Sequence, residues 1–424
     1  MRPLDALEMI LRELGMEERH DLWIVQWEES YEAFPGEPLP ILDRTYVEAQ
    51  VRAIGLDLDF RHALVEGIGL FSRQPALKRL LWHVYFRLFV RKVTAYPRWP
   101  DLPDELDEAA PLFYGYVFLL QVPKLLALHR QRKIDPAVTR ATLQDLQLWM
   151  QDFQNQKGVV GLSSGQVSWL ALHFEGSLFH LERLQFEFAT FKYPYLAFRR
   201  RSDGSISAFS SPENPLNGAG LPGAASVGED LQQRAESFTM GKGPFTGYPI
   251  GPLGRTTSTP ALLSRKEWEV ALKPGDPTIA VHIPATGPMD FDACGQSFLA
   301  ARTFFARHFP AYHAKAYTCS SWLLDPQLEA YTNPSGNIAR FLGEWYLLPY
   351  PNATEREALR RVFGVTERPE NLATLSQRTS LQRDMVAFLR SGGTPGAGLG
   401  LQFPDTMAWG KQVYRSLWEQ CSPV

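Results

Sequence analysis

The residues best suited to chemistry gather in the C-terminal half, along segment 281–295 (VHIPATGPMDFDACG). A strand expected over 278–283 carries His282 near its end, a loop with Pro284 and Gly287 follows, and a helix is expected from about Asp290. A histidine near the carboxyl end of a strand lies where open α/β sheets bind ligands, and it can act as a general base at neutral pH. A buried histidine bonded to a main-chain carbonyl would look the same in sequence. Both interpretations therefore stay open.

The start of the expected helix is a candidate anion site. Helix N-termini carry unpaired N–H groups and the positive end of the helix dipole, which suit a phosphate. Asp290 and Asp292 would repel a pyrophosphate, and Asp290 is equally well explained as a helix N-cap. The spacing alone leaves an anion site and a simple cap as alternatives.

The next expected strand carries a second group of reactive or polar residues, Cys319, Ser320, Ser321 and Trp322. Cys319 with His282 is one possible pair of nucleophile and base. Cysteine is among the most buried residue types, however, and no GxSxG elbow flanks this one. We therefore expect the four residues to be structural or to line a substrate pocket.

A tyrosine and an asparagine follow in the segment EAYTNPSGN. Tyr331 is a candidate proton donor, and Asn333 is a candidate polar lining residue. A tyrosine that only packs at the start of a helix is the alternative interpretation.

The elements around these residues alternate between strand and helix. The sequence predicts strands over 278–283 and 314–323 and helices over 291–308, 328–346 and 378–389. A strand–helix–strand–helix order implies a parallel or mixed sheet covered by helices.

The rest of the chain differs in character. Residues 1–155 show apolar residues at three- and four-residue spacing and predict an all-helical domain. After Gly158 come aromatic-rich, partly alternating stretches, of which 184–188 (LQFEF) is a half-buried strand with Gln185 and Glu187 on its polar face. The segment 209–260 is dense in Gly, Pro and Ser, so we expect irregular structure there, with a short helix at 229–236.

Composition excludes several classes of protein. The 424 residues include 43 Lys and Arg against 46 Asp and Glu, a net charge of −3, which argues against a dedicated nucleic-acid binder. The apolar fraction of 45% with 21% charged residues excludes global disorder. Three distant cysteines make neither a disulfide framework nor a CxxC zinc site, which favours a reducing compartment. The N-terminus lacks a signal-like apolar stretch and the longest apolar run, 111–127, is interrupted, so we expect a soluble cytoplasmic protein.

Several motifs together resemble a bacterial family of acyltransferase domain-containing proteins, which join a helical N-acyltransferase-type N-terminal domain to a GNAT-like C-terminal domain. The resemblance covers most of the chain. The segments that carry it are HFEGSLF (173–179), RLQF (183–186), WEVALKPGDP (268–277), VHIPATGPM (281–289), CSSWLLDP (319–326) and TSLQR (379–383).

This resemblance implies an acyl-CoA donor, acetyl-CoA or another acyl-CoA, and a direct transfer without a covalent cysteine intermediate. In the GNAT-like fold two neighbouring parallel strands splay apart, and the thioester arm lies between them. Here the strands 278–283 and 314–323 would be the splayed pair. The acceptor would lose a proton to His282, the thiolate would gain one from Tyr331, and main-chain N–H groups would stabilise the oxyanion. The residues expected to contact the CoA are Ile283, Pro284, Thr286, Gly287 and Gly295.

The sequence departs from the family pattern at one point. GNAT enzymes carry a Gln/Arg-x-x-Gly-x-Gly/Ala loop at the pyrophosphate, and only Gly287 and Gly295 are present here. Either the CoA binds differently, or the fold has been kept while the activity has changed.

The sequence thus predicts an α+β or α/β chain of two domains, a helical domain over 1–155 and a GNAT-like mixed-sheet domain over 156–424 with a long loop at 209–260. Its expected function is transfer of an acyl group, acetyl by first expectation, to a small amine or hydroxyl acceptor, with no metal, nucleic acid or membrane involved. The helical domain and the long loop would shape the acceptor pocket. Two alternatives are a non-catalytic module that binds a carbohydrate or other polar ligand, and a hydrolase that uses Cys319 and His282. The acceptor and the oligomeric state are not determined by the sequence.

Overall fold

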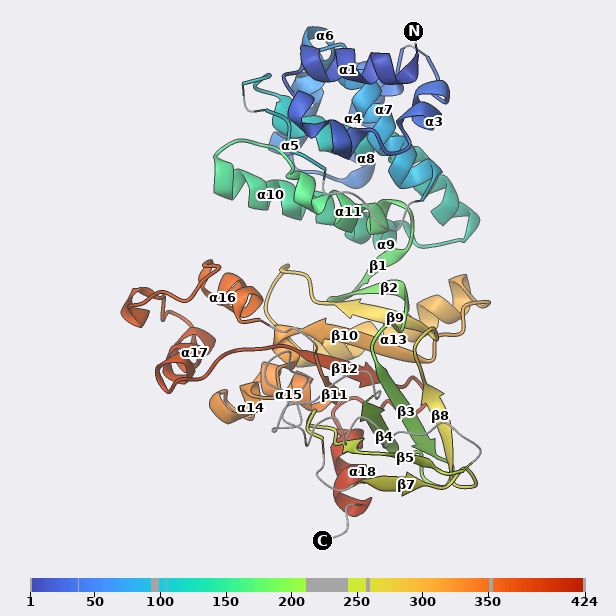
Figure 1. Cartoon of the computed structure of the whole chain (residues 1–424), viewed down its shortest axis with the longest axis vertical. Helices are drawn as coiled ribbons and strands as arrows, with labels where there is room; N and C mark the ends of the chain where they lie inside the picture. The colour runs from blue at the N-terminus through green and yellow to red at the C-terminus, as the bar shows by residue number, and fades with distance from the viewer. Residues whose placement is uncertain are drawn as a thin grey trace. The chain divides into compact units, whose positions relative to one another are not determined.

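The chain divides into two compact units in the computed structural model, a helical unit (Met1–Leu181) and a sheet unit (Glu182–Val424) (Figure 1). The structure describes residues 2–36, 38–92, 99–103, 105–210, 243–256, 260–350 and 354–421. The division falls later than the predicted one at 155/156, which lies inside the helix α10, Asp145–Lys157. The reason is that one further helix, α11, Val167–Phe174, packs against α8, Phe113–Gln131, of the helical unit.

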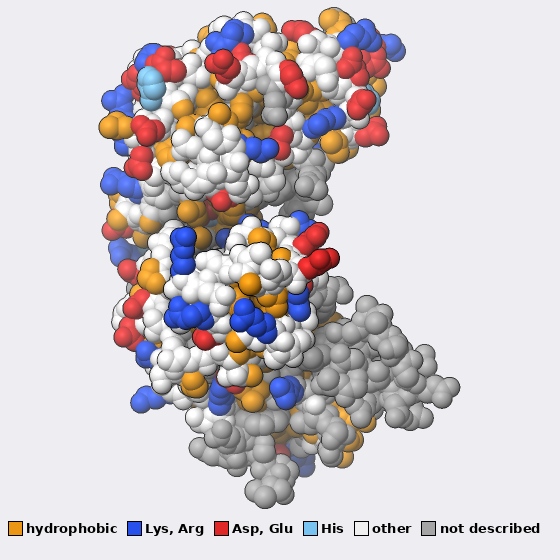
Figure 2. All heavy atoms as spheres, turned by 90° about the vertical axis from the view of Figure 1, so that its left-hand side faces the viewer, with side chains coloured by type: hydrophobic (Ala, Val, Ile, Leu, Met, Phe, Trp, Pro, Cys, Tyr) orange, Lys and Arg blue, Asp and Glu red, His pale blue; other side chains and the backbone are white. Residues whose placement is uncertain are grey.

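The helical unit is built as the periodicity predicts, from short helices with apolar stripes turned inward. Its elements are α1 (Pro3–Glu13), α2 (His20–Trp23), α3 (Trp27–Glu32), α4 (Arg44–Ile54), α5 (Leu58–Glu66), α6 (Leu70–Arg73), α7 (Leu77–Tyr85), α8, α9 (Pro136–Leu143), α10, α11 and a final strand β1 (Leu178–Leu181). Figure 2 shows acidic and basic side chains interspersed over the visible face of this unit.

The helix α8 forms the centre of the helical unit. With the residues before it, 110–131, it is long and apolar enough in composition to cross a membrane, and 61% of its most apolar window is buried inside the unit. The Tyr116 hydroxyl donates a hydrogen bond to the Leu64 carbonyl at 2.7 Å, and the Tyr46 hydroxyl donates one to the Leu119 carbonyl at 3.2 Å. These bonds join α8 to α5 and α4, as expected of a core helix.

The sheet unit contains a mixed sheet whose strands run in the order β2-β9-β10-β12-β11. Among these five described strands β9 and β10 are the one pair of parallel neighbours, joined by the crossover helix α13, while β2 pairs with β9 and β12 pairs with β10 and β11 in antiparallel fashion. These strands are β2 (Leu184–Thr190), β9 (Pro277–His282), β10 (Ala316–Ser321), β11 (Tyr346–Pro349) and β12 (Gly398–Gln402).

A second sheet packs against part of the first. It has the order β6-β4-β3-β8, and a separate two-stranded ribbon joins β5 to β7. The buried layer between the two main sheets includes Tyr195 and Leu272 from the second sheet with Tyr346 and Leu401 from the first. The strands are β3 (Tyr195–Arg200), β4 (Ile206–Ser210), β5 (Phe245–Gly247), β6 (Pro249–Ile250), β7 (Ala261–Leu263) and β8 (Trp268–Leu272).

One long helix covers the other face of the first sheet. Phe298 of this helix packs edge-on against Phe186 and Tyr317, with ring centroids 5.7 and 5.3 Å apart. Shorter helices follow, of which α14, α16 and α17 share a small apolar cluster. The helices are α13 (Phe291–His308), α14 (Leu328–Tyr331), α15 (Asn337–Gly343), α16 (Arg356–Phe363), α17 (Ser380–Arg390) and α18 (Val413–Cys421).

The structure confirms the predicted fold class and most of the predicted elements. The helix predicted at 291–308 has those bounds, and the strand predicted at 184–188 extends to Thr190. The helical segment predicted over 328–346, with its Asn-Pro interruption, forms two short helices on either side of the turn 332–336, which contains that proline and a glycine. Strands β5 and β6 replace part of the expected irregular structure at 209–260, and the short helix predicted at 229–236 lies outside the described residues.

Two buried histidines make the helical unit sensitive to acid. His83 is fully buried among Trp23, Trp27 and Trp99, and this burial lowers its pKa to about 3; burial likewise lowers the pKa of His129 to about 4. Below pH 6.5 the unfolded chain takes up protons that the folded chain cannot accept. The free energy of unfolding should therefore fall from about pH 6.5 toward pH 4, by about 1.4 kcal/mol per pH unit and histidine.

We expect His83→Phe to remove a large part of this acid sensitivity. The measurement is urea unfolding between pH 7 and pH 4.5, followed by tryptophan fluorescence. His62→Ala, which changes an exposed histidine of the same unit, is the control and should keep the wild-type pH dependence. An equal loss of stability with pH in His83→Phe and wild type would contradict the assignment.

Candidate functional site

The two parallel strands of the sheet unit part in the middle. β9 and β10 pair through Thr278 with Ala316 and through Ala280 with Thr318, and among the described residues their pairing goes no further. Beyond that point β9 still pairs with β2 as far as His282, and β10 still pairs with β12 as far as Ser321. The inner edges of the two strands therefore separate, which is the splay that the sequence led us to expect.

His282 lies at this splay and has a carboxylate partner. Its Nε2 lies 2.7 Å from Oε2 of Glu187, which projects from the neighbouring strand β2. A carboxylate oxygen accepts and the ring Nε2–H donates in this contact, which fixes the orientation of the imidazole. Both side chains are partly exposed, at 31% and 21%, so the pair can be reached from solvent. A histidine oriented by a carboxylate is the arrangement of a general base.

A hydroxyl pair lies on the same face of the sheet. Ser320 shares the face of His282, because Thr318 and Ala280 are in register and side chains alternate along each strand. Ser320 lies close to Tyr193, which precedes β3, and Tyr193 also lies within electrostatic reach of Glu187. Burial raises the pKa of Tyr193, so its phenol keeps its proton at neutral pH. The face thus combines a base with a proton donor.

Cys319 points to the opposite face, under α13. It alternates with Thr318 and Ser320, so the sheet lies between its thiol and His282. Burial raises the pKa of Cys319 to about 12 and that of Cys294 to about 11, which keeps both as thiols at neutral pH. The predicted alternative of a hydrolase with Cys319 as nucleophile and His282 as base is therefore not supported by the geometry.

One arginine holds the loop between β9 and α13 through hydrogen bonds to its main chain. Arg183, at the start of β2, donates hydrogen bonds to the main-chain carbonyls of Pro284, Gly287 and Pro288. Gly287 has a φ of +152°, a conformation that side chains rarely adopt, and the structure thus gives a reason for a glycine there. Ile283 and Thr286 belong to the same loop.

The two aspartates at the start of α13 are both engaged. Oδ1 of Asp290 accepts a hydrogen bond from the main-chain N–H of Ala293 at 2.7 Å, so Asp290 is the N-cap. Asp292 faces Arg340 of α15 at 3.9 Å, and the Arg340 guanidinium stacks on the Phe291 ring at 3.8 Å. Of the acidic charge that weighed against an anion site, that of Asp292 is thus faced by an arginine of another element, while Asp290 caps the helix.

Gly295 lies in the second turn of α13 and packs against a tryptophan. A Cβ at this position would lie 2.5 Å from Cδ1 of Trp409, so the close approach of the indole requires glycine. The Trp409 Nε1 donates a hydrogen bond to the Phe291 carbonyl at 3.0 Å. This packing explains Gly295 without a ligand, and its predicted contact with CoA stays a prediction.

The structure separates the remaining predicted residues from the His282 face. Oγ of Ser321 accepts from the Leu323 main-chain N–H at 3.1 Å, and Trp322 packs against the apolar cluster of α16 and α17. Tyr331 stacks flat on Phe388, with centroids 4.2 Å apart, and burial raises its pKa. No contact joins Tyr331 to His282 among the described residues.

Asn333, in contrast, lies near the loop between β9 and α13. It lines a hollow of about 220 Å³ together with Met289 of the loop after β9, Asn337 of α15 and Ser380 of α17. The hollow is mostly apolar, with amides, hydroxyls and the carboxylate of Asp384 as its polar groups. Asn333 also accepts a hydrogen bond from the Ser335 main-chain N–H at 3.0 Å, so part of its polar capacity holds the turn.

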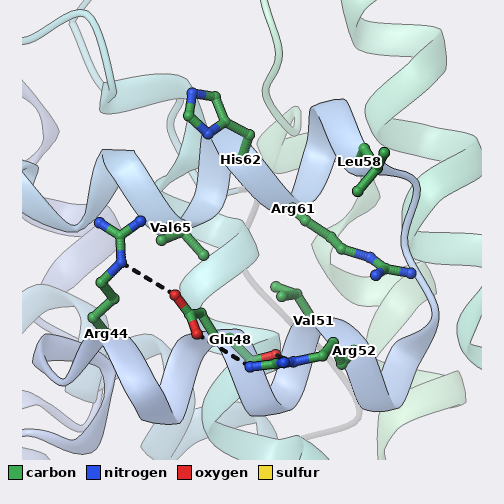
Figure 3. A pocket seen from close by; sticks show the side chains of 8 residues that line it. All are labelled: Arg44, Glu48, Val51, Arg52, Leu58, Arg61, His62 and Val65. Atoms are coloured by element: carbon green, nitrogen blue, oxygen red, sulfur yellow. Dashed lines mark hydrogen bonds and ion pairs between the residues drawn. The ribbon is translucent and has the colours of Figure 1, made fainter.

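A second hollow of about 300 Å³ lies on the helical unit between α4 and α5 (Figure 3). Its charged side chains are largely paired with one another, since Arg44 and Arg52 both donate to Glu48 at 3.1 Å. Such exposed pairs are typical of a solvated helix surface. We therefore do not assign the reaction to this hollow. Within the described residues no group of three or more His, Cys, Asp and Glu side chains converges on a metal site.

Four residues of this site were missed or given no role in the sequence analysis: Arg183, Glu187, Tyr193 and Arg340. The alternation over 184–188 did place Glu187 on a polar face, but not next to His282. The pairing of β2 with β9 joins residues about 95 positions apart, and no local pattern reveals such a register.

Comparison with known families agrees with this architecture. A model of an N-acyltransferase N-terminal domain matches residues 48–176, and a model of a GNAT-like C-terminal domain matches residues 178–402. The second match alone spans more than half of the chain. The chain belongs to this family of acyltransferases.

Solved acyltransferase structures show the same fold over the whole length. An acyltransferase in complex with decanoyl-CoA and teicoplanin is 26% identical, with 94% of this chain and 99% of that chain covered and a TM-score of 0.65. An acyltransferase mutant in complex with octanoyl-CoA is 25% identical, with coverages of 95% and 99% and a TM-score of 0.64. A comparison with curated proteins yields no match. The predicted family and fold of this acyltransferase are thereby confirmed.

The burial of the two cysteines of this acyltransferase predicts slow alkylation. At pH 8 Cys294 and Cys319 of the folded protein should react with iodoacetamide at least about tenfold more slowly than in 8 M urea, because the thiolate is scarce and enclosed. Mass spectrometry of peptides resolves each cysteine. Fast alkylation of Cys319 in the folded protein would restore the nucleophile hypothesis.

Proposed function

We propose that this acyltransferase moves an acyl group of medium length from acyl-CoA to an amine of a small-molecule acceptor by direct transfer. The single observation that carries the proposal is the parting of β9 from β10 with His282 and its Glu187 partner at the opening. The solved acyltransferases that share the fold are complexes with octanoyl-CoA, decanoyl-CoA and, in one case, teicoplanin. These donors favour a longer chain over the acetyl group expected from the sequence.

The donor would enter along the parted strands. The facing main-chain edges of β9 and β10 beyond Ala280 and Thr318 are not joined to each other, so they are available to the amide groups of a pantetheine arm. The phosphates would lie at the start of α13, where the loop of Ile283, Pro284, Thr286 and Gly287 precedes free helix N–H groups. In this placement the thioester arm lies between β9 and β10 and the phosphates lie at the loop after β9, as the family resemblance implies.

The acceptor would be activated by His282. The amine nitrogen attacks the thioester carbon, and its proton passes to the imidazole, whose orientation is held by Glu187 through the 2.7 Å contact. The tetrahedral intermediate then collapses, the C–S bond breaks, and an amide and CoA thiolate result. No side chain of the enzyme becomes acylated.

The thiolate then needs a proton. Tyr193 is the better-placed acid, because it lies close to Ser320 on the face of His282 and retains its proton at neutral pH. Tyr331, the acid expected from the sequence, is stacked on Phe388 within the apolar cluster shared by α14, α16 and α17. A cytoplasmic location in a bacterium, which suits a donor such as acyl-CoA, is part of this proposal.

The first test measures donor binding and turnover. Calorimetric titration should give micromolar binding of decanoyl-CoA and weaker binding of acetyl-CoA. His282→Ala should lower kcat by about 10²- to 10⁴-fold with nearly unchanged donor affinity, since it removes the general base. His313→Ala, an exposed histidine of the same unit, is the matched control. Absence of binding to any CoA thioester at millimolar concentration would favour the non-catalytic binding module instead.

The second test assigns the acid. Tyr193→Phe should lower kcat by about 10- to 10²-fold, with a smaller effect for acyl donors whose leaving thiol is more acidic. Tyr331→Phe is to be measured beside it. A larger loss in Tyr331→Phe than in Tyr193→Phe would reverse the assignment.

A further inference from the structure

One guanidinium holds the whole loop between β9 and α13. Nε of Arg183 donates to the carbonyl of Pro288 at 2.9 Å, and Nη2 donates to that of Gly287 at 2.8 Å. Nη1 donates to the carbonyl of Pro284 at 3.1 Å. Three main-chain oxygens that are spread over five residues thus converge on one planar cation.

The loop is built to allow this convergence. Gly287, at a φ of +152°, gives the main chain the freedom to turn its carbonyl toward Arg183. The two prolines on either side restrict the chain and donate no hydrogen bond themselves. The main-chain N–H of Arg183 also donates to Oγ of Ser297 on α13 at 2.9 Å. Arg183 therefore ties the start of β2 both to the loop and to the helix that the loop begins.

The bonds have an electrostatic consequence for an anion. The three carbonyl oxygens point toward Arg183 and therefore away from the opposite side of the loop. An anion on that opposite side does not face their partial negative charges. The segment IPATGPM (283–289) contains no basic residue of its own, and Asp290 follows it. Any fixed positive charge beneath this loop has to come from another element, and Arg183 supplies it.

We propose that Arg183 is the positioning residue of the donor loop, which holds residues 284–288 in the conformation that receives the phosphate-bearing end of acyl-CoA. Its guanidinium takes the place of the glycine-rich loop motif that this sequence lacks. The inference rests on the proposed function for the identity of the ligand. The ordering of the loop itself does not depend on a ligand.

The experiment compares Arg183→Lys and Arg183→Gln with wild type in the full chain. Lysine keeps the charge but lacks the fork that reaches three carbonyls, and glutamine lacks both. Arg360→Gln is the matched control, since the side chain of Arg360, a surface arginine, is hydrogen bonded among the described residues only to Glu357 of its own helix. If Arg360→Gln and wild type have equal melting temperatures, the loss of a surface arginine does not by itself destabilise the protein.

The first readout is amide hydrogen exchange of peptides that cover 283–297, in the absence of ligand. Both Arg183 variants should exchange at least about tenfold faster there, with the strands β10 and β12 unchanged. The second readout is steady-state kinetics with decanoyl-CoA, supported by calorimetry with decanoyl-CoA and free CoA. The KM for the donor should rise by about tenfold or more, while kcat at saturating donor changes by less than about threefold.

Several outcomes would overturn the proposal: unchanged exchange in the loop, full recovery by Arg183→Lys, or a loss of kcat at constant KM. Full recovery by lysine would mean that charge alone matters, and a pure kcat effect would mean that the arginine does not act through donor binding. A wild-type protein that binds no CoA would overturn the proposed function together with the ligand named here. In that case the exchange data would still decide whether Arg183 holds the loop.

Discussion

The parting of β9 from β10 is the constraint on which the rest of the sheet unit depends. Main-chain N–H and C=O groups that lose a strand partner are costly unless something else satisfies them, so a splay inside a sheet must be held open from outside. Here the outer edges supply the support, because β2 stays paired with β9 to His282 and β12 stays paired with β10 to Ser321. An acyl donor that hydrogen bonds along the opening would complete the pairing that the strands lack.

The support on the β10 side depends on glycines. A Cβ at Gly398 would lie 1.9 Å from the carbonyl oxygen of Leu324, and one at Gly400 would lie 2.6 Å from the Trp345 ring. These glycines let the turn after β10 and a buried tryptophan lie directly against β12. The close packing fixes β10 on the side away from the splay, and the position of Ser320 follows from it.

The two faces of the sheet carry different groups of side chains, because successive side chains of each strand point to opposite faces. The face under α13 is lined by aromatic side chains and covered by this helix. Cys319 lies on this face and is therefore out of reach of solvent and of His282. The other face carries the Glu187–His282 pair at the opening, with Ser320 and Tyr193 close to each other beside it. A shift of one residue in the pairing of β2 with β9 would turn Glu187 away and remove the orientation of the imidazole. The chemistry therefore depends on strand register as much as on residue type.

The sequence by itself determined the fold class and most of the elements. Local spacing was enough for α13, for β9 and β10 and for the helical unit, because apolar periodicity and capping residues act within a few positions. It also singled out His282 and the loop of Gly287. Tertiary structure alone decided the partners: Glu187 for His282, Arg183 for the carbonyls of the loop, and Arg340 for Asp292. These contacts join residues tens to about a hundred positions apart, and they form only when strand register and helix packing bring distant segments together. For the same reason the sequence left Cys319 open as a nucleophile until its face of the sheet was known.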